Sequence, residues 1–247
     1  MREIISKNNE TIKFIKSLSL AKIRKKENLF IIEGMRFVKD AIAYGITPRL
    51  LCSTEAADIA SFEGCEKITV NENVFSFISE VKSPQGILGV FELPCCELKN
   101  FSGTRAVYMQ GVQMSENVGA VIRSAACCGF DAVLTDKNTA DAFSPKAVRA
   151  SAANIFKIKI FTDVSLTELK NMQSNGFEIV GAHLKGKEDV IFDAEKIILA
   201  VGNEGNGLNE DIVNICDRLV RIPISRDCES LNVACAVTLL MYKIKGY

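Results

Sequence analysis

The sequence predicts an α/β protein in which a small α/β domain precedes a larger domain with a mostly parallel sheet. Short apolar segments of strand length alternate with amphipathic segments of helical period along most of the chain. This alternation is interrupted from Pro94 onward by a stretch that contains proline, glycine and serine and has no periodic pattern of apolar residues. The 247 residues suffice for two domains, and 48% hydrophobic with 24% charged residues is typical of folded proteins. We therefore expect a first domain at residues 1–94, a linker at 95–104 and a second domain at 105–247.

The first domain opens with residues 9–26, whose apolar side chains at helical spacing and basic opposite face predict one helix. A second helix is expected from Met35 to Tyr44, where Gly45 ends it. The other segments of the alternation are 30–32, 49–52, 68–70, 74–79 and 86–91. Together these segments predict a compact α/β unit.

The second domain continues as a longer series of strands and helices. Helices are expected at 118–128, which Gly129 ends, at 146–153, with Pro145 in the first turn, and from Ser230 to about Tyr242. The strands expected between them are 106–109, 132–134, 158–161, 177–180 and 197–201. This alternation predicts a mostly parallel sheet with helices on both faces.

Positive charge is concentrated in the first part of a chain whose net charge is zero. Residues 1–50 contain eleven Lys and Arg but five Asp and Glu, and the densest group consists of Lys22, Arg24, Lys25 and Lys26. Such a cluster is either a solvated helix face or a surface that binds phosphate groups.

Several function classes find little support in the sequence. Nine cysteines in a long chain without an export signal indicate reduced thiols and a cytoplasmic protein, and the adjacent cysteine pairs lack the spacing of a metal site. His183 is the sole histidine, so nucleophilic catalysis with a histidine base is not indicated. No apolar run approaches the roughly 20 residues that cross a membrane. We expect neither a metal nor a membrane partner.

A glycine-rich segment, Gly202–Gly207, follows the expected strand 197–201. In open α/β sheets, ligands bind beyond the carboxyl ends of the strands, and glycines allow close backbone approach. The spacing matches neither the dinucleotide fingerprint nor a P-loop, which argues against a nucleotide-dependent oxidoreductase. The segment is therefore either a tight turn or a ligand loop of another kind.

Three further polar residues stand in apolar surroundings. Ser230 is the expected N-cap of the last helix, and Asn232 beside it needs partners for both its donor and its acceptor. Arg123 follows two apolar residues in an expected helix with small neighbours, so we expect it to be partly buried and paired with an anion. That anion is either a carboxylate in a salt bridge or a substrate phosphate.

Four blocks in the second domain resemble, in order, motifs of the SpoU/TrmH class of the SPOUT superfamily of RNA 2′-O-ribose methyltransferases. The blocks are 117–123 (NVGAVIR), 144–151 (SPKAVRAS), 202–207 (GNEGNG), and 222–224 (IPI) with 230–236 (SLNVACA). The first domain resembles, more weakly, the ribosomal-protein-like RNA-binding domain that often precedes such a catalytic domain.

The resemblance implies a sheet whose C-terminal region forms a trefoil knot, S-adenosylmethionine (AdoMet) bound in that knot, and a homodimer. It implies that the cofactor contacts Gly202, Asn203, Glu204, Gly205, Ile222, Ile224, Ser230 and Leu231. It implies a catalytic cluster of Arg123, Asn117, Glu204, Ser230 and Asn232. The basic cluster would then bind RNA.

The implied reaction is an in-line attack of a ribose 2′-hydroxyl on the sulfonium methyl group, which requires positioned reactants and an activated alcohol. Arg123 would either take the proton or hold the adjacent phosphate, and free arginine, with a pKa above about 12, is a poor base. A separate N-terminal α/β domain favours 23S-type ribosomal RNA as substrate. The alternatives are transfer RNA and a non-catalytic RNA-binding protein.

Two segments depart from the pattern of the family. Residues 114–116, Met-Ser-Glu, stand where the family usually has Asp-Pro-Gly, and residues 152–154, Ala-Ala-Asn, lack an expected glycine. The first change alters the rigidity of a loop without removing Asn117 or Arg123. Both departures bear on the fit of the substrate.

Overall fold

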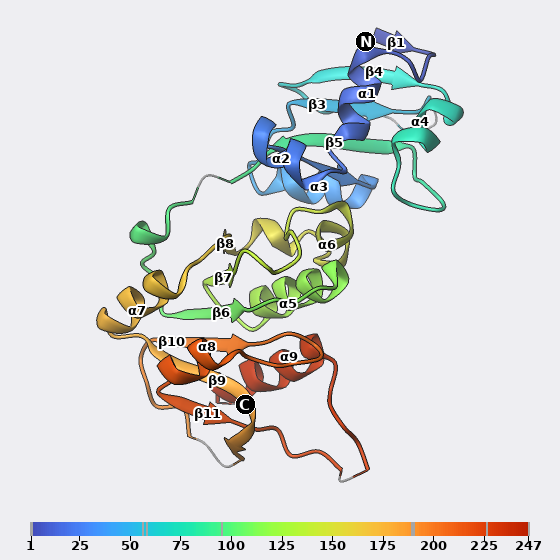
Figure 1. Cartoon of the computed structure of the whole chain (residues 1–247). Helices are drawn as coiled ribbons and strands as arrows, with labels where there is room; N and C mark the ends of the chain where they lie inside the picture. The colour runs from blue at the N-terminus through green and yellow to red at the C-terminus, as the bar shows by residue number, and fades with distance from the viewer. Residues whose placement is uncertain are drawn as a thin grey trace. The chain divides into compact units, whose positions relative to one another are not determined.

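The computed structural model describes residues 2–55, 57, 59–94, 96–188, 191–225 and 227–246. The chain forms two compact units (Figure 1). Unit 1 is Met1–Cys95 with Phe143–Phe156, and unit 2 is Cys96–Ala142 with Lys157–Tyr247, so the chain passes between the units three times. Three residues at which predicted domains or the linker begin or end lie outside the described residues: Met1, Cys95 and Tyr247.

Unit 1 contains a mixed five-stranded sheet with the strand order β1-β4-β3-β5-β2. Its elements are β1 (Arg2–Ile4), α1 (Glu10–Ser17), α2 (Ala21–Glu27), β2 (Leu29–Glu33), α3 (Met35–Ala43), β3 (Leu50–Ser53), β4 (Glu66–Val70), α4 (Glu72–Ile78), β5 (Ile87–Glu92) and α6 (Pro145–Ala150). Strand β5 runs antiparallel to both of its neighbours, and the other pairs are parallel.

The single helix expected at residues 9–26 is wrong, because the chain forms α1 and α2 with a turn between them. The buried stripe of Ile12, Ile15 and Leu18 would continue at position 22, which is a lysine. The turn keeps Leu18 buried and leaves Lys22 exposed.

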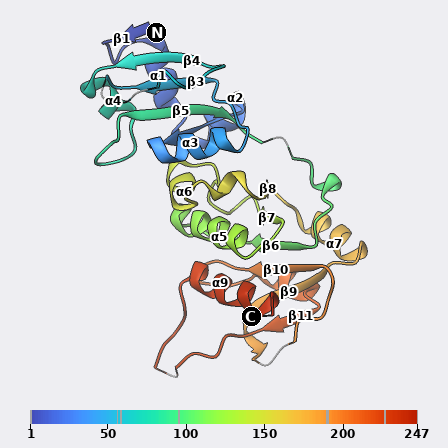
Figure 2. The same cartoon turned by 180° about the vertical axis from the view of Figure 1, so that it is seen from behind.

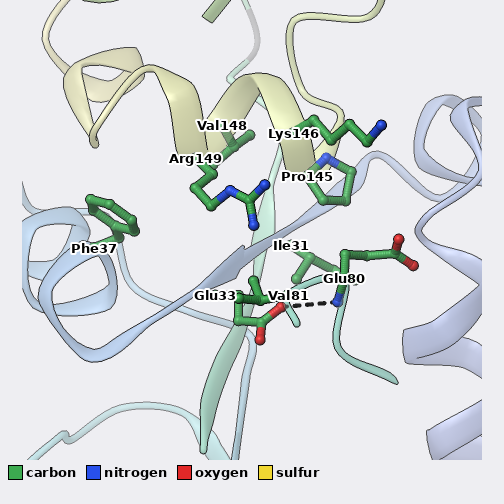
Figure 3. Close-up of a pocket in the computed structure, with 9 residues that line it drawn as sticks. All are labelled: Ile31, Glu33, Phe37, Glu80, Val81, Pro145, Lys146, Val148 and Arg149. Carbon is green, nitrogen blue, oxygen red and sulfur yellow. Dashed lines mark hydrogen bonds between the residues drawn. The ribbon is translucent and has the colours of Figure 1, made fainter. Parts of the chain in front are cut away.

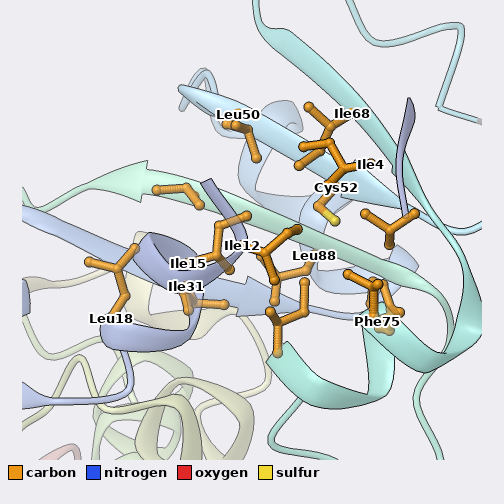
Figure 4. Close-up of a cluster of buried hydrophobic side chains, with 14 of the residues drawn as sticks. Ile4, Ile12, Ile15, Leu18, Ile31, Leu50, Cys52, Ile68, Phe75 and Leu88 are labelled. Atoms are coloured by element: carbon orange, nitrogen blue, oxygen red, sulfur yellow. The ribbon is translucent and has the colours of Figure 1, made fainter. Parts of the chain in front are cut away.

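Both faces of this sheet are covered. Helices α1 and α4 pack on one face, where side chains such as Ile12 and Phe75 lie against the strands (Figure 4). On the other face, Phe30 packs edge-to-face against Phe143 at 5.3 Å between ring centroids, and Phe156 contacts both Phe30 and Phe91. The segment around α6 therefore contributes aromatic side chains to the core of unit 1.

Unit 2 contains a six-stranded sheet with the order β11-β9-β10-β6-β7-β8, and all of its pairs are parallel. Its elements are β6 (Arg105–Met109), α5 (Ser115–Cys127), β7 (Ala132–Thr135), β8 (Lys159–Phe161), α7 (Leu166–Ser174), β9 (Glu178–Lys187), β10 (Ile197–Val201), α8 (Glu210–Ile215), β11 (Arg218–Val220) and α9 (Val233–Ile244). The predicted α/β fold with a parallel sheet is confirmed.

The two faces of this sheet bury alternate residues of the same strands. Ala106, Tyr108 and Leu134 pack with residues of α7 and α8. Helices α5 and α9 pack against each other and against β6, β7 and β10 (Figure 2). Within the described part of the chain, no helix is long and apolar enough to span a membrane.

Candidate active site

The site is built where the central strands β6 and β10 end. These strands pair in register, with Met109 opposite Val201, and the amide of Gln110 extends the ladder by donating to the carbonyl of Val201 at 2.8 Å. The loops that follow the two strands therefore start side by side at the carboxyl edge of the sheet. This is the edge at which ligands bind in open parallel sheets.

The loop after β10 is a tight turn. Asn203 and Gly207 exchange two backbone hydrogen bonds, at 3.1 and 2.9 Å. A Cβ atom on Gly202 would lie 1.9 Å from the carbonyl carbon of Gly207, so no other residue fits at this position. Gly207 has a φ of +68°, which favours glycine.

The side chain of Asn203 holds this turn against the loop after β6. Its Nδ2 donates to the carbonyl oxygen of Gly111 at 2.8 Å. Its Oδ1 accepts from the amides of Gly205 and Asn206, at 2.8 and 3.2 Å. Asn203 thus orders the backbone of the glycine-rich loop.

Glu204 anchors the start of α5. Its carboxylate accepts hydrogen bonds from the amides of Gln113 and Met114, at 3.1 and 3.3 Å, and from Nδ2 of Asn117, at 2.9 Å. Partial burial acts to raise the pKa of Glu204, but the hydrogen bonds to Asn117 and to the backbone outweigh it and lower the pKa. Glu204 is therefore a fixed anion at neutral pH.

Asn117 connects the 202–207 block to the 230–236 block. It is 7% exposed, donates to Glu204 and accepts from Nδ2 of Asn232 at 3.0 Å. The Oδ1 of Asn232 accepts from the amides of Ala234 and Cys235 and caps α9. The expectation that Ser230 caps this helix is wrong, because the helix begins at Val233 and Asn232 is its N-cap.

Arg123 is exposed, so the expectation of partial burial is also wrong. Val121 and Ile122 precede it in sequence, but each helical residue turns by about 100°, and these two face the core while Arg123 faces solvent. Its guanidinium forms no hydrogen bond or ion pair with any described residue. The structure therefore leaves Arg123 outside the network of Asn117, Glu204 and Asn232.

The segment between β11 and α9 carries the remaining expected site residues. Where it is described, it forms neither helix nor strand. Ser230 is exposed, Ile222 is half-buried, and the apolar side chains of Ile224 and Leu231 are 36% and 40% exposed. Large apolar side chains exposed next to a polar network are typical of a surface that a ligand covers.

The basic cluster is divided by the structure. Arg24 is 2% exposed, and its Nη1 donates to the carbonyls of Leu18 and Ser19 at 2.7 Å, just beyond the end of α1. Lys22, Lys25 and Lys26 are exposed. Arg24 therefore stabilises the fold of unit 1, and only the three lysines of the cluster are exposed to bind phosphate groups.

A pocket in unit 1 is too small for a cofactor. It has a volume of about 20 Å³, which accommodates a single water molecule, and it lies between β2 and α6 (Figure 3). Arg149 and Glu33 extend into it, and the carboxylate of Glu33 accepts hydrogen bonds from the Ser79 hydroxyl and the Glu80 amide.

Gly111 and Gln113 also belong to this site, although neither is among the site residues expected from the sequence. The carbonyl of Gly111 accepts from the side chain of Asn203. The backbone amide of Gln113 donates to Glu204. The side-chain amide of Gln113 donates to the carbonyls of Gly111 and Asn138. Most of these contacts involve backbone groups, which leave no pattern in the sequence. The glycine after strand β6 was the available signal.

Solved structures and characterised relatives resemble this chain over nearly its whole length. It is 31% identical, over all of both chains, to the 23S rRNA (guanosine(2553)-2'-O)-methyltransferase RlmP of Bacillus subtilis (strain 168). It is 26% identical, over 98% of this chain and 91% of the relative, to the 23S rRNA (uridine(2479)-2'-O)-methyltransferase of Streptomyces viridochromogenes. The AdoMet-bound rRNA methyltransferase of Sinorhizobium meliloti superposes with a TM-score of 0.90 at 28% identity, covering 99% of this chain and 97% of that one.

Two family models match the chain in separate regions. Residues 9–89 match the MRM3-like substrate binding domain. Residues 104–242 match the model of the SpoU rRNA methylase family, and they include every residue of the hydrogen-bonded network. Since this match spans more than half of the sequence, the chain belongs to the SpoU rRNA methylase family.

Proposed function

We propose that this chain transfers the methyl group of AdoMet to a ribose 2′-hydroxyl of 23S ribosomal RNA. The network that joins Glu204, Asn117 and Asn232 carries the proposal, because it connects three motifs of the family through side-chain hydrogen bonds. The two relatives named for 23S rRNA 2′-O-methylation, which match this chain nearly end to end, support the choice of RNA.

We assign substrate capture to the first domain and chemistry to the second. The proposed boundaries are 1–94 for the RNA substrate-binding domain, 95–104 for the linker and 105–247 for the methyltransferase domain, of which residues 143–156 pack with unit 1. The two family matches, 9–89 and 104–242, support these boundaries. Lys22, Lys25 and Lys26 supply exposed positive charge for phosphate contacts in the first domain.

The residues around the glycine-rich loop fit AdoMet. The turn at 202–207 exposes backbone without side chains at Gly205 and Gly207, and the exposed Ile224 and Leu231 offer apolar contacts to the adenosine or the methionine chain of AdoMet. The residues proposed to hold the cofactor are Gly202, Asn203, Glu204, Gly205, Ile222, Ile224, Ser230 and Leu231. When bound, AdoMet supplies an electrophilic methyl group on a sulfonium sulfur.

The residues of this chain then position the alcohol. Glu204 and Asn117 hold the start of α5 against the cofactor loop, and Asn232 fixes α9 to the same point. Arg123, exposed on α5, has the planar donor fork that binds an RNA phosphate in two hydrogen bonds. We propose that Arg123 binds the phosphate next to the target ribose. We assign to Ser230, in the segment between β11 and α9, a contact to the substrate or the cofactor.

We also propose the features that are common to the family. The C-terminal region forms a trefoil knot, two chains form a homodimer, and the enzyme acts in the cytoplasm. The match of residues 104–242 to the SpoU rRNA methylase family supports these assignments.

The test is methyl transfer from labelled AdoMet to purified 23S rRNA and, in parallel, to bulk transfer RNA. The rRNA should be taken from cells that lack this protein, so that its target ribose is unmodified. We expect label in 23S rRNA and not in transfer RNA. Label in transfer RNA alone would overturn the choice of substrate, and absence of label in either RNA would overturn the proposed activity.

A further inference from the structure

We infer that Asp136, which lies outside all four sequence motifs, is a positioning residue for the cofactor loop. It follows β7, the neighbour of β6 in the sheet, and it controls the loop after β10 through Gly111. This inference rests on the proposed function, because it assigns the loop 202–207 to AdoMet.

Two successive hydrogen bonds, one between Asp136 and Gly111 and one between Gly111 and Asn203, form what we call the relay. The first contact is between Asp136 and Gly111. The carboxylate Oδ1 of Asp136 accepts a hydrogen bond from the amide of Gly111 at 2.9 Å. Gly111 has a φ of +65°, so its peptide groups are held in an orientation that other residues adopt with strain. The hydroxyl of Thr139 lies 2.6 Å from the same carboxylate oxygen and donates to it.

The second contact is between Gly111 and Asn203. The carbonyl oxygen of Gly111 accepts from Nδ2 of Asn203, and Oδ1 of the same amide accepts from Gly205 and Asn206. A correct orientation of Gly111 therefore fixes the side chain of Asn203, and this side chain fixes the backbone that we assign to AdoMet. The relay runs across the carboxyl ends of three adjacent strands, β7, β6 and β10.

The chemistry explains why an acceptor is needed at position 136. The amide of Gly111 leaves the β6 ladder and points to the side chain of Asp136. Without an acceptor there, the amide of Gly111 is free to turn toward solvent. This changes φ of Gly111 and with it the direction of its carbonyl, which accepts from Asn203. A hydrogen bond to a charged acceptor is among the stronger ones in proteins, and it is enough to decide the orientation of one peptide.

The test compares Asp136→Ala with Asp136→Asn in the full chain. The demethylated product S-adenosylhomocysteine is the probe, and its Kd is measured by calorimetry at a temperature where circular dichroism shows folded protein. We expect the Kd of the alanine variant to rise about tenfold, the equivalent of one such hydrogen bond. Asparagine retains an oxygen acceptor, so we expect its Kd to stay within about threefold of wild type.

Asp131→Ala is the matched control. The carboxylate of Asp131 also accepts from backbone amides, those of Thr104 and Arg105 at 2.7 and 2.9 Å, but at the opposite edge of the same sheet. This variant should lower the Tm while leaving the Kd unchanged. The Kd for substrate RNA should be the same in wild type, Asp136→Ala and Asp131→Ala.

The outcomes separate this inference from the proposed function. If wild type does not bind S-adenosylhomocysteine, the cofactor assignment fails. If wild type binds and Asp136→Ala binds equally well, the relay is overturned while the proposed function stands. An equal rise of the Kd in Asp136→Ala and Asp131→Ala would also overturn the relay, because the effect would then reflect general destabilisation.

Discussion

Helices α2 and α5 each carry an arginine that the sequence places in a functional cluster, and the structure gives the two arginines opposite environments. Arg24 of α2 is buried and bonded to the carbonyls that follow α1, although charged residues surround it in sequence. Arg123 of α5 is exposed and without a partner among the described residues, although apolar residues precede it. Neighbours in sequence therefore do not indicate the environment of a long side chain. The environment of the side chain depends on which face of the helix carries it and on whether carbonyl groups without a hydrogen-bond donor lie within its reach.

The largest expected effect concerns Arg123. Arg123→Ala should lower the rate of methyl transfer by a factor on the order of 10²–10³, as loss of one well-placed hydrogen-bond donor does in other active sites. The Kd of S-adenosylhomocysteine should stay unchanged, since Arg123 is assigned to the RNA. Lysine should restore little activity because it lacks the planar fork.

Arg36→Ala is a suitable control, because Arg36 is exposed on α3 in unit 1. The measurement is initial rate against RNA concentration, with cofactor affinity from calorimetry. A rate for Arg123→Ala within about threefold of wild type would contradict the role given to this arginine.

The second effect is on stability. Arg24→Ala should lower the free energy of unfolding by about 3 kcal/mol, because two carbonyls lose a charged donor in the protein interior. Lys22→Ala, on the exposed face of the same helix, should change it by less than about 0.5 kcal/mol. Urea unfolding monitored by circular dichroism measures both. Equal effects of the two changes would contradict the structural role of Arg24.

The third effect is on RNA binding by the three exposed lysines. Each phosphate contact contributes about 0.7–0.9 to the slope of log affinity against log salt concentration. Replacing Lys22, Lys25 and Lys26 by alanine should therefore flatten the slope by up to roughly 2 units. The folded fraction of Arg24→Ala should keep the wild-type slope. An unchanged slope in the triple variant would make this cluster a solvated helix face.

The smallest expected effect is on the pH dependence of stability and concerns the carboxylate of Glu204. The pKa of Glu204 is lower in the folded protein than its ordinary value of 4.5. Its ionised form therefore contributes stability above about pH 4.5, and this contribution is lost as the pH falls through the lowered pKa. Thermal unfolding between pH 6 and pH 3 should show a smaller loss of Tm in Glu204→Gln than in wild type. A loss of the same size in both would contradict the hydrogen-bonded role of the carboxylate.

The sequence predicted the parallel sheet and the family because these depend on patterns that repeat along the chain. Strands β7 and β10 are buried throughout, and β6 is buried except for its first residue, Arg105, as expected for strands covered on both faces. It also brought together Asn117, Glu204 and Asn232, by resemblance of motifs. The structure adds the hydrogen bonds that connect these three residues.

Features that depend on single contacts could not be predicted. Asn232 rather than Ser230 caps α9, and both residues are good N-caps, so only the helix start decides between them. Strand β11 has three residues, of which one is buried, too few to show a period. The packing of Phe143 against Phe30 joins residues more than a hundred positions apart, and no local pattern indicates such a contact.

The position of the transferred methyl group tests the central claim most directly. After reaction of 23S rRNA with labelled AdoMet, the RNA is hydrolysed in alkali, which cleaves next to every free 2′-hydroxyl and leaves a dinucleotide wherever the ribose is methylated. We predict that the label is recovered in one alkali-stable dinucleotide with wild-type protein and is lost with Arg123→Ala. Label recovered in mononucleotides would place the methyl group on a base and would contradict the account.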